Sequence, residues 1–266
     1  MKSFPAPLLL IFLTLAGCGD PPPPPDAGVL REPDRADVVE IIARNTAALG
    51  GEAALDAVQT MVKRSIIEEG QYRDIAVFAT DRRGRMRIDI FADGKRVYAE
   101  SFDGQLGHQW QTGAEQTPSS ARGTIAMSHT PHLPNHIFRL KHLTANGHQV
   151  ELVGSESIDG VDYHVLKVTL SDGFETYALI NSDSGLVTRS RNKRALHVDV
   201  NDDQKVIESR MDDFRQVGDI VHPHSVVEVD LASGEILSRV TLESLELNKP
   251  LPEDYFGDLV KTVPEL

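Results

Sequence analysis

The 266-residue sequence contains one cysteine, Cys18. An internal disulfide is therefore impossible, and a metal site built on several thiolates is excluded. Basic residues are also scarce, because 27 lysines and arginines oppose 40 aspartates and glutamates, which gives a net charge of −13. Nucleic acid and anionic membrane surfaces repel such a chain, so no nucleic-acid partner is expected.

The apolar run at the start is too short for a membrane-spanning helix, which needs about 20 residues. It covers Leu8 to Leu15 and follows the positive charge of Lys2, which is typical of an export signal. The next residues, ending in Ala16-Gly17-Cys18, resemble the lipobox of bacterial lipoproteins. This resemblance implies that residues 1–17 are a signal peptide and that Cys18 becomes the lipidated first residue. An ordinary secretory signal with an incidental cysteine is the alternative.

Residues 18–33 are predicted to be a tether between this anchor and a folded body. Pro21 to Pro25 favour a stiff, solvated polyproline II segment. Gly19 directly follows Cys18, where aspartate would imply retention in the inner membrane. The resemblance to lipoproteins therefore implies the cell envelope of a Gram-negative bacterium, with the protein on the outer membrane and facing the periplasm. One domain is expected over residues 34–266.

The sequence also lacks the common catalytic motifs. It has no G-x-S-x-G, Walker A, G-x-G-x-x-G or H-E-x-x-H pattern. We therefore predict that the protein is not an enzyme and needs no cofactor. A metal-dependent hydrolase remains an alternative because of a histidine-rich stretch, in which His129, His132 and His136 have a spacing that suits zinc on a helix. Pro131 and Pro134 break such a helix, so a surface flap is the default interpretation, and His142 is the fourth candidate ligand.

The hydrophobic pattern predicts a mainly β protein with a few α-helices. An amphipathic helix is expected over 34–49, with Asp34 as its N-cap and Asn45 on its inner side, and a short helix over 52–58. About eleven strands follow, joined by turns such as Asp93-Gly94 and Asp159-Gly160. They are expected near 61–69, 72–80, 85–92, 95–103, 148–157, 161–170, 174–181, 186–199, 204–217, 220–231 and 235–247. So many strands with tight hairpins predict one large, curved antiparallel sheet, an incomplete β-barrel.

The concave face of such a sheet needs a cover. The first helix and the proline-broken segment 117–146 are the available pieces, and two small covers on a large apolar face are expected to leave a cavity. Apolar residues of this segment and the single tryptophan are the candidate ligand contacts: Met127, Phe138, Trp110, Leu133 and Ile137. Met127 and Phe138 are the preferred pair.

A basic stripe is expected on one side of a late strand, where Arg189, Arg191 and Lys193 alternate. A solvated outer face is the favoured interpretation, and contact with a lipid head group or an acidic partner is the alternative.

Several stretches resemble the LolA/LolB-like superfamily of periplasmic lipoprotein carriers and receptors. They are ALGGEAALDAVQTM (48–61), SFDGQLGHQW (101–110), DGVDYHVLKVTLSDGFETYALINSDSGLVTRS (159–190), GDIVHPHSVVEV (218–229) and LNKPLPEDYF (247–256). The resemblance implies a half-barrel with helices in its mouth that binds acyl chains. Cys18 places this chain nearer the anchored receptors than the soluble carriers of that family.

The sequence therefore predicts a lipid-anchored periplasmic protein that binds acyl chains, lipoproteins or another hydrophobic ligand. It would act as a non-catalytic carrier or receptor, held at the membrane through Cys18. An envelope-stress sensor or scaffold that binds a periplasmic protein partner is the alternative.

Overall fold

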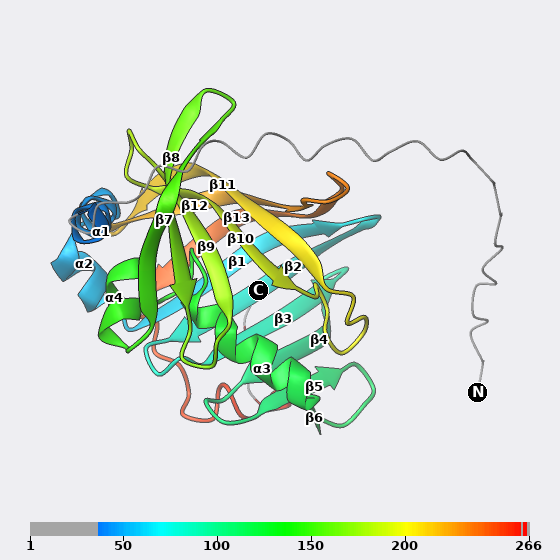
Figure 1. The fold of residues 1–266 in the computed structure, drawn as a ribbon. Coiled ribbons are helices and arrows are strands. Elements are labelled where there is room, and N and C mark those ends of the chain that lie inside the picture. Colours follow the sequence, from blue (N-terminus) through cyan, green and yellow to red (C-terminus); the bar gives the residue numbers. More distant parts are fainter. Residues whose placement is uncertain (1–36, 262, 265–266) are drawn as a thin grey trace, which may run out of the picture.

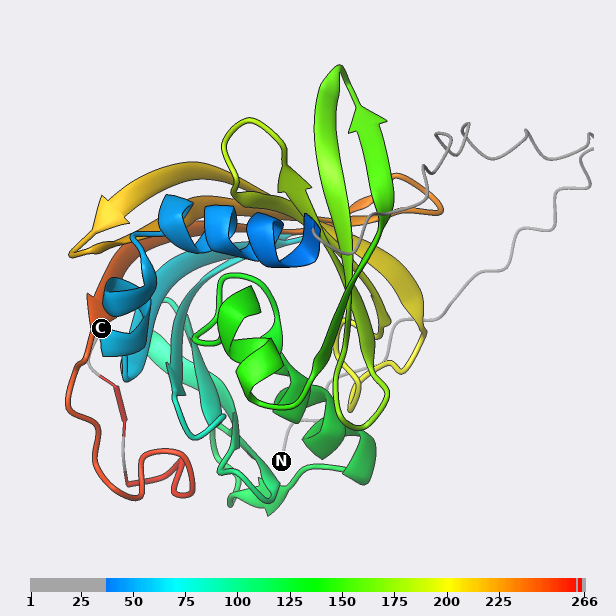
Figure 2. The same ribbon diagram turned by 60° about the vertical axis from the view of Figure 1, so that its left-hand side comes forward.

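The computed structural model describes residues 37–261 and 263–264. Their strands form one 13-stranded antiparallel sheet in the order β6-β5-β4-β3-β2-β1-β13-β12-β11-β10-β9-β8-β7. The sheet curves around a hollow, and within the described residues no pairing closes it, so it is an incomplete barrel (Figures 1 and 2). The predicted fold class is confirmed. The signal peptide, Cys18, the tether and the predicted N-cap Asp34 lie outside the described residues.

The strands are numbered in chain order. Their bounds are β1 Thr60–Glu69, β2 Tyr72–Asp81, β3 Met86–Ala92, β4 Lys95–Phe102, β5 Gly107–Gln111, β6 Thr117–Pro118, β7 Gln149–Ile158, β8 Val161–Thr169, β9 Glu175–Asn181, β10 Val187–Arg194, β11 Lys205–Val217, β12 Ile220–Asp230 and β13 Ile236–Leu247. Strands that follow one another in the sequence pair as hairpins, except β6 and β7, which lie at the two edges of the sheet. β1 pairs with β13 and joins the two halves. Asp93-Gly94 and Asp159-Gly160 turn with positive φ at both residues, as tight hairpins require.

The strand count is higher than the eleven that the sequence predicted. β5 and β6 were missed because GHQWQ is polar and does not alternate, and because β6 has only two residues. The tenth strand also ends earlier than expected, at Arg194. Residues 195–204 form a loop instead, which is closed by an isolated bridge between His197 and Asn201.

The helices lie on the concave face of the sheet, inside the hollow (Figure 2). They are α1 Asp37–Ala48, α2 Glu52–Ala57, α3 Ala121–His129 and α4 Leu140–Ala145, with a 3-10 turn, η1, at Thr130–His132. Gly50 ends α1 against the β11–β12 turn with φ +117°, and a Cβ there would collide with the Asp219 oxygen. Glycine is therefore required where α1 meets the sheet. No helix in the described part of the chain is long and apolar enough to cross a membrane.

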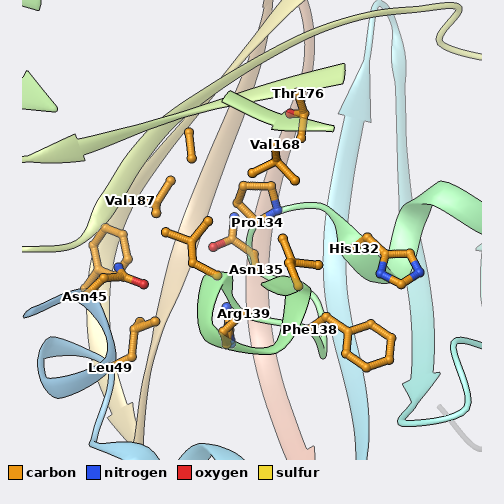
Figure 3. A pocket seen from close by; sticks show the side chains of 14 residues that line it. Asn45, Leu49, His132, Pro134, Asn135, Phe138, Arg139, Val168, Thr176 and Val187 are labelled. Atoms are coloured by element: carbon orange, nitrogen blue, oxygen red, sulfur yellow. The ribbon is translucent and has the colours of Figure 1, made fainter. Parts of the chain in front are cut away.

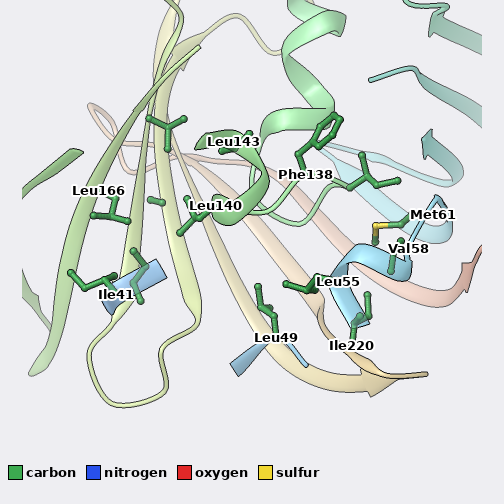
Figure 4. Close-up of a cluster of buried hydrophobic side chains, with 14 of the residues drawn as sticks. Ile41, Leu49, Leu55, Val58, Met61, Phe138, Leu140, Leu143, Leu166 and Ile220 are labelled. Carbon is green, nitrogen blue, oxygen red and sulfur yellow. The ribbon is translucent and has the colours of Figure 1, made fainter. Parts of the chain in front are cut away.

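The two largest hydrophobic clusters of the described residues occupy opposite faces of the sheet. The larger one fills the hollow and joins α1, α2 and α4 to the inner face (Figure 4). It includes Ile41, Leu55, Met61, Leu140, Leu143 and Leu166. The smaller one lies on the outer face, where Tyr255 and Phe256 pack against Val62 and Val77. Residues 249–261, called the C-terminal segment below, therefore cover the outer side of β1–β4.

Candidate functional site

The hollow is closed by residues 119–146, called the cover below, which contain α3, η1 and α4. Pro131 and Pro134 break the helical path, as the sequence predicted, and Asn135 turns the chain with φ +71°. The Phe138 amide then donates to the Pro131 oxygen at 3.2 Å, which closes this loop before α4 begins. The cover is thus a series of short pieces.

The inner side of the cover packs into the large hydrophobic cluster. Leu140 and Leu143 of α4 are 5% and 3% exposed, and they lie beside Ile41 of α1 and Leu166 of β8 (Figure 4). Burial of such side chains contributes about 1.5–3 kcal/mol each. The apolar contact therefore holds α4 in place.

Polar contacts at the rim join α4 to α2. Lys141 Nζ donates to Glu52 at 3.0 Å and to Asp56 at 2.9 Å. His142 Nδ1 accepts the Arg139 amide at 3.2 Å, which leaves Nε2 to donate to Asp56 at 2.8 Å. Asp56, Lys141 and His142, called the latch below, are at the solvent edge of the cover. Hydrogen bonds from Lys141 and then His142 lower the pKa of Asp56.

A cavity of about 30 Å³ remains between α1, the cover and strands β8–β11 (Figure 3). Its apolar lining includes Leu49, Phe138, Leu140, Leu143, Val168, Val187 and Phe214, and its polar lining Asn45, His132, Asn135, Arg139 and Thr176. This volume holds a few water molecules, whereas ligand pockets measure about 300–1,000 Å³. The expected cavity exists, but it is smaller than an acyl chain requires in this closed conformation. A ligand enters only if the cover moves.

The five predicted ligand contacts are dispersed. Phe138 lines the cavity, and Ile137 lines a smaller hollow beside Leu55. Met127 is 5% exposed and packs so close to Gly107 of β5 that a Cβ there would overlap it. Leu133 is partly buried and does not line the cavity. Their contact with a ligand stays a prediction.

Trp110 lies apart from the cavity lining. The Arg96 guanidinium packs over its ring, 4.3 Å from the ring centre. Arg96 in turn donates to the Leu259 oxygen in the C-terminal segment at 2.5 Å. Trp110 therefore supports the packing of the C-terminal segment in this conformation.

The histidines of the cover have separate partners. His129 binds Asp172 at 2.6 Å, and His132 stacks on Phe138 with ring centres 4.8 Å apart. His136 packs edge-on against Phe78, and His142 belongs to the latch. Burial lowers the pKa of His132 to about 4. Among the described residues no group of three or more histidine, cysteine or acidic side chains could hold a metal ion, so the structure does not bring His129, His132, His136 and His142 together as a ligand set.

Several lining residues escaped the sequence analysis. Arg139 and Asn135 line the cavity, and Lys63 Nζ donates to the Asn135 backbone oxygen. Lys63 had a detectable signal, because it has the same parity as the inward residues Met61 and Ser65 in an alternating strand. A charged residue on the inner face of a sheet indicates a candidate functional site.

The basic stripe is paired on the outer face. Arg189 and Arg191 both bind Glu208, at 2.8 Å and 2.7 Å, and Arg191 also binds Glu156. Glu208 is 1% exposed. The two arginines are therefore engaged with carboxylates of the protein.

Solved structures with this fold come from several bacteria. A LolA superfamily protein from Nitrosomonas europaea matches 82% of this chain and 97% of its own, with 16% identity and a TM-score of 0.53. A DUF1329 family protein from Desulfovibrio piger matches 82% and 96%, also at 16% identity and 0.53. A domain assigned to outer membrane lipoprotein sorting, from Vibrio parahaemolyticus, matches 84% and 97% at 12% identity and 0.53.

The sequence matches no protein-family model and no curated protein. The structural likeness, at 12–16% identity, shows the fold. The chain has the LolA-like half-barrel fold that its sequence predicted.

Proposed function

We propose that this protein binds acyl chains, lipoproteins or another hydrophobic ligand inside the half-barrel, as a non-catalytic carrier or receptor. The proposal includes lipidation of Cys18 and a position on the outer membrane facing the periplasm. One observation carries it: the largest apolar cluster of the described residues lies inside an open sheet, under a cover built from short, proline-broken pieces. The name of the Vibrio parahaemolyticus domain, which refers to lipoprotein sorting, agrees with this function.

The energetics of opening favour exchange between cover and ligand. Displacing α4 exposes Phe138, Leu140 and Leu143, which costs about 1.5–3 kcal/mol for each side chain. A hydrocarbon chain that takes their place returns about 0.8 kcal/mol per buried methylene group. A chain of about ten methylene groups therefore offsets the loss of the cover contacts. The closed cover and the bound ligand compete for the same apolar surface.

The first test is the recovery of bound lipid. Residues 26–266 contain every described element and lack Cys18, so this chain is purified, extracted with solvent and measured by mass spectrometry. We expect about one hydrophobic molecule per protein. Absence of bound lipid, together with no binding of a fluorescent fatty acid, would refute the proposed function.

A matched pair of variants locates the ligand. Phe138→Asp places a charge in the cavity lining, whereas Ile125→Asp places the same charge on α3 at a side chain that is 53% exposed. We expect Phe138→Asp to lower lipid recovery several-fold and Ile125→Asp to leave it unchanged. Circular dichroism and a denaturation midpoint confirm that each variant is folded. Equal recovery from both variants would place the ligand away from the cavity.

A further inference from the structure

Basic side chains lie where the cover meets the inner face of the sheet. Lys63 of β1 faces inward with Met61. Its Nζ donates to the Asn135 backbone oxygen at 3.2 Å and lies 4.8 Å from the centre of the Phe78 ring. Part of the side chain is exposed, but its ammonium group is enclosed, and burial, with the Arg139 charge as the second cause, lowers the pKa of Lys63 to about 7. No carboxylate of the described residues pairs with Nζ.

Arg139 is more deeply enclosed, since this residue is 8% exposed. It lines the cavity and also the smaller hollow beside Ile137. Its Nη2 is buried without a hydrogen-bond partner, and no carboxylate of the described residues pairs with the guanidinium. Burial, then the nearby charge of Arg82, lowers the pKa of Arg139 to about 10, so the group is charged at neutral pH. A buried guanidinium nitrogen without an acceptor costs stability, because it loses water without gaining a hydrogen bond.

Two histidines lie beside the cations and add no negative charge. The ring of His222 in β12, which is 3% exposed, faces two backbone oxygens: Nδ1 lies 2.7 Å from the Pro223 oxygen and Nε2 lies 3.2 Å from the Asn135 oxygen. A neutral ring donates to one of the two. His136 of the cover has a buried Nδ1 without a partner among the described residues. Burial, then the charge of Lys63, holds the pKa of both histidines well below the usual value, so both are neutral at pH 7. Lys63, Arg139, His136 and His222 are called the basic cluster below.

The missing partner of the basic cluster is an anion. A carboxylate or phosphate offers negative charge and several acceptor lone pairs, and its hydrogen bonds to charged donors are roughly twice as strong as neutral ones. We propose that the basic cluster binds the anionic head group, a carboxylate or a phosphate, of an amphiphile whose hydrocarbon chain enters the apolar part of the hollow. This inference rests on the proposed function and names the class of its ligand.

The arrangement of the cavity fits an amphiphile in one orientation. Asn135 and Arg139 lie together in the cover, and both line the cavity (Figure 3). The backbone oxygen of Asn135 also lies 3.2 Å from Lys63 Nζ and 3.2 Å from His222 Nε2. The apolar lining, with Leu140, Val168 and Val187, continues from there toward α1 and β8–β10. The head group would therefore lie at the basic cluster and the chain among the apolar side chains.

The test compares probes that share one hydrocarbon chain. Dodecanoic acid, its methyl ester and dodecyl phosphate are titrated into residues 26–266 by calorimetry, with inorganic phosphate as the anion without a chain. We expect the acid and the alkyl phosphate to bind at least about tenfold tighter than the ester, since hydrogen bonds to charged groups are worth at least that factor. Inorganic phosphate is expected to bind far more weakly than dodecyl phosphate.

Four variants test the residues. Lys63→Met and Arg139→Met should each weaken binding of the acid about tenfold and leave the ester within about twofold. Arg139→Lys, which keeps the charge, should retain the preference for the acid. Lys95→Met, at an exposed position of β4, should change nothing. If Arg139→Met fails to fold, Lys63→Met and Arg139→Lys still decide the result.

The outcomes separate this inference from the proposed function. Equal affinity of the wild-type chain for acid and ester, or equal loss of both in the variants, would overturn the head-group site while leaving the hydrophobic site intact. Inorganic phosphate that binds as tightly as dodecyl phosphate would overturn the amphiphile. Failure of every alkyl probe to bind would refute the proposed function itself.

Discussion

Buried cations have a carboxylate partner on the outer face of the sheet, whereas those of the basic cluster on the inner face have none among the described residues. On the outer face, Arg87 is 0% exposed, yet it donates to both carboxylate oxygens of Asp89 at 2.7 Å and 2.9 Å and to the Tyr255 backbone oxygen. Arg96 shares Asp89 at 2.6 Å, although its Nη2 has no partner in the described residues. These bonds fasten the C-terminal segment to β3 and β4. The inner face has the basic cluster, in which Lys63 and Arg139 have no carboxylate.

The difference separates a structural network from the binding site that we propose. A buried cation with its carboxylate present stabilises one conformation, whereas a buried cation without one lowers stability until an anion arrives. The protein carries an excess of acidic residues, and Asp89 shows that one can be buried beside arginines. On the outer face Arg87 and Arg96 share a carboxylate of the protein, whereas on the inner face we propose that a ligand supplies the anion.

The largest effect is expected from breaking the outer network. Asp89→Asn removes the carboxylate that Arg87 and Arg96 share, which should lower the free energy of unfolding by about 3–5 kcal/mol. Chemical denaturation followed by circular dichroism measures it. The matched control is Glu253→Gln, at an exposed residue of the C-terminal segment, which should cost nothing. A loss below about 1 kcal/mol for Asp89→Asn would show that the network does not fasten the segment.

Removing a cation from the inner face should have the opposite sign. Lys63→Met should raise the free energy of unfolding of the ligand-free protein by several kcal/mol at pH 6, because burial lowers the pKa of Lys63 from 10.5 to about 7 and one pKa unit is worth about 1.4 kcal/mol. The pKa of Lys63 is about 7 in the fold and normally 10.5, so between these values only the unfolded chain binds the proton. Wild-type stability therefore rises with pH across this window, and the advantage of the variant shrinks.

Denaturation at pH 6 and pH 9 checks this pH dependence, with Lys95→Met as the control. The other groups that face Lys63 are His136 and Arg139 from the cover and His222 from β12. Burial, the first cause of the lowered pKa of both histidines, is the same in the two proteins, so we expect their titration to contribute less to the difference than that of Lys63. A destabilised Lys63→Met at pH 6 would contradict the proposed cost of the unpaired ammonium group.

Weakening the latch should loosen the cover without unfolding the sheet. Asp56→Asn removes the charge that Lys141 and His142 bind, so hydrogen exchange of residues 140–146 should become several-fold faster while the global midpoint barely moves. Asp183→Asn, at an exposed turn, is the control. The carboxylate of Asp56 contributes above its usual pKa of 3.8 and is lost as the pH falls below its lowered folded pKa. Unchanged exchange at neutral pH would remove the latch from the account.

Cys18→Ser is expected to have the smallest effect on stability and on ligand binding. The mature body should keep its stability and its ligand affinity, because Cys18 precedes the tether and every described element. Fractionation of the bacterial envelope and labelling with palmitate should show loss of membrane attachment. A variant that stays lipidated or membrane-bound would contradict the anchor.

The sequence predicted most strands of the sheet and the broken cover well, because the signals for both were local. Alternation and paired turn residues such as Asp93-Gly94 defined eleven strands, and Pro131 and Pro134 marked the cover as broken. β6, at the edge of the sheet, and β5 beside it were missed because their register comes from the neighbours with which they pair. Asn45 was expected on the inner side of the first helix, and its Nδ2 donates to the Gly185 oxygen at 2.8 Å.

The site was harder to predict because its parts meet only in the folded chain. Lys63, Arg139 and His222 come from three distant stretches, and Arg139 stands between apolar residues without any motif. Met127 and Trp110 were chosen for their hydrophobicity, yet they pack against β5 and Arg96. Size and polarity alone cannot tell a residue that fills a core from one that lines a cavity.

Hydrogen exchange with and without dodecanoic acid tests the central claim most directly, because the cavity of about 30 Å³ forces a ligand to displace the cover. At saturating acid, we expect faster exchange in residues 140–146, which contain α4, and unchanged exchange in β1, β2, β12 and β13. Binding of the acid with unchanged or slower exchange in residues 140–146 would show that the chain does not displace α4 and would contradict this account.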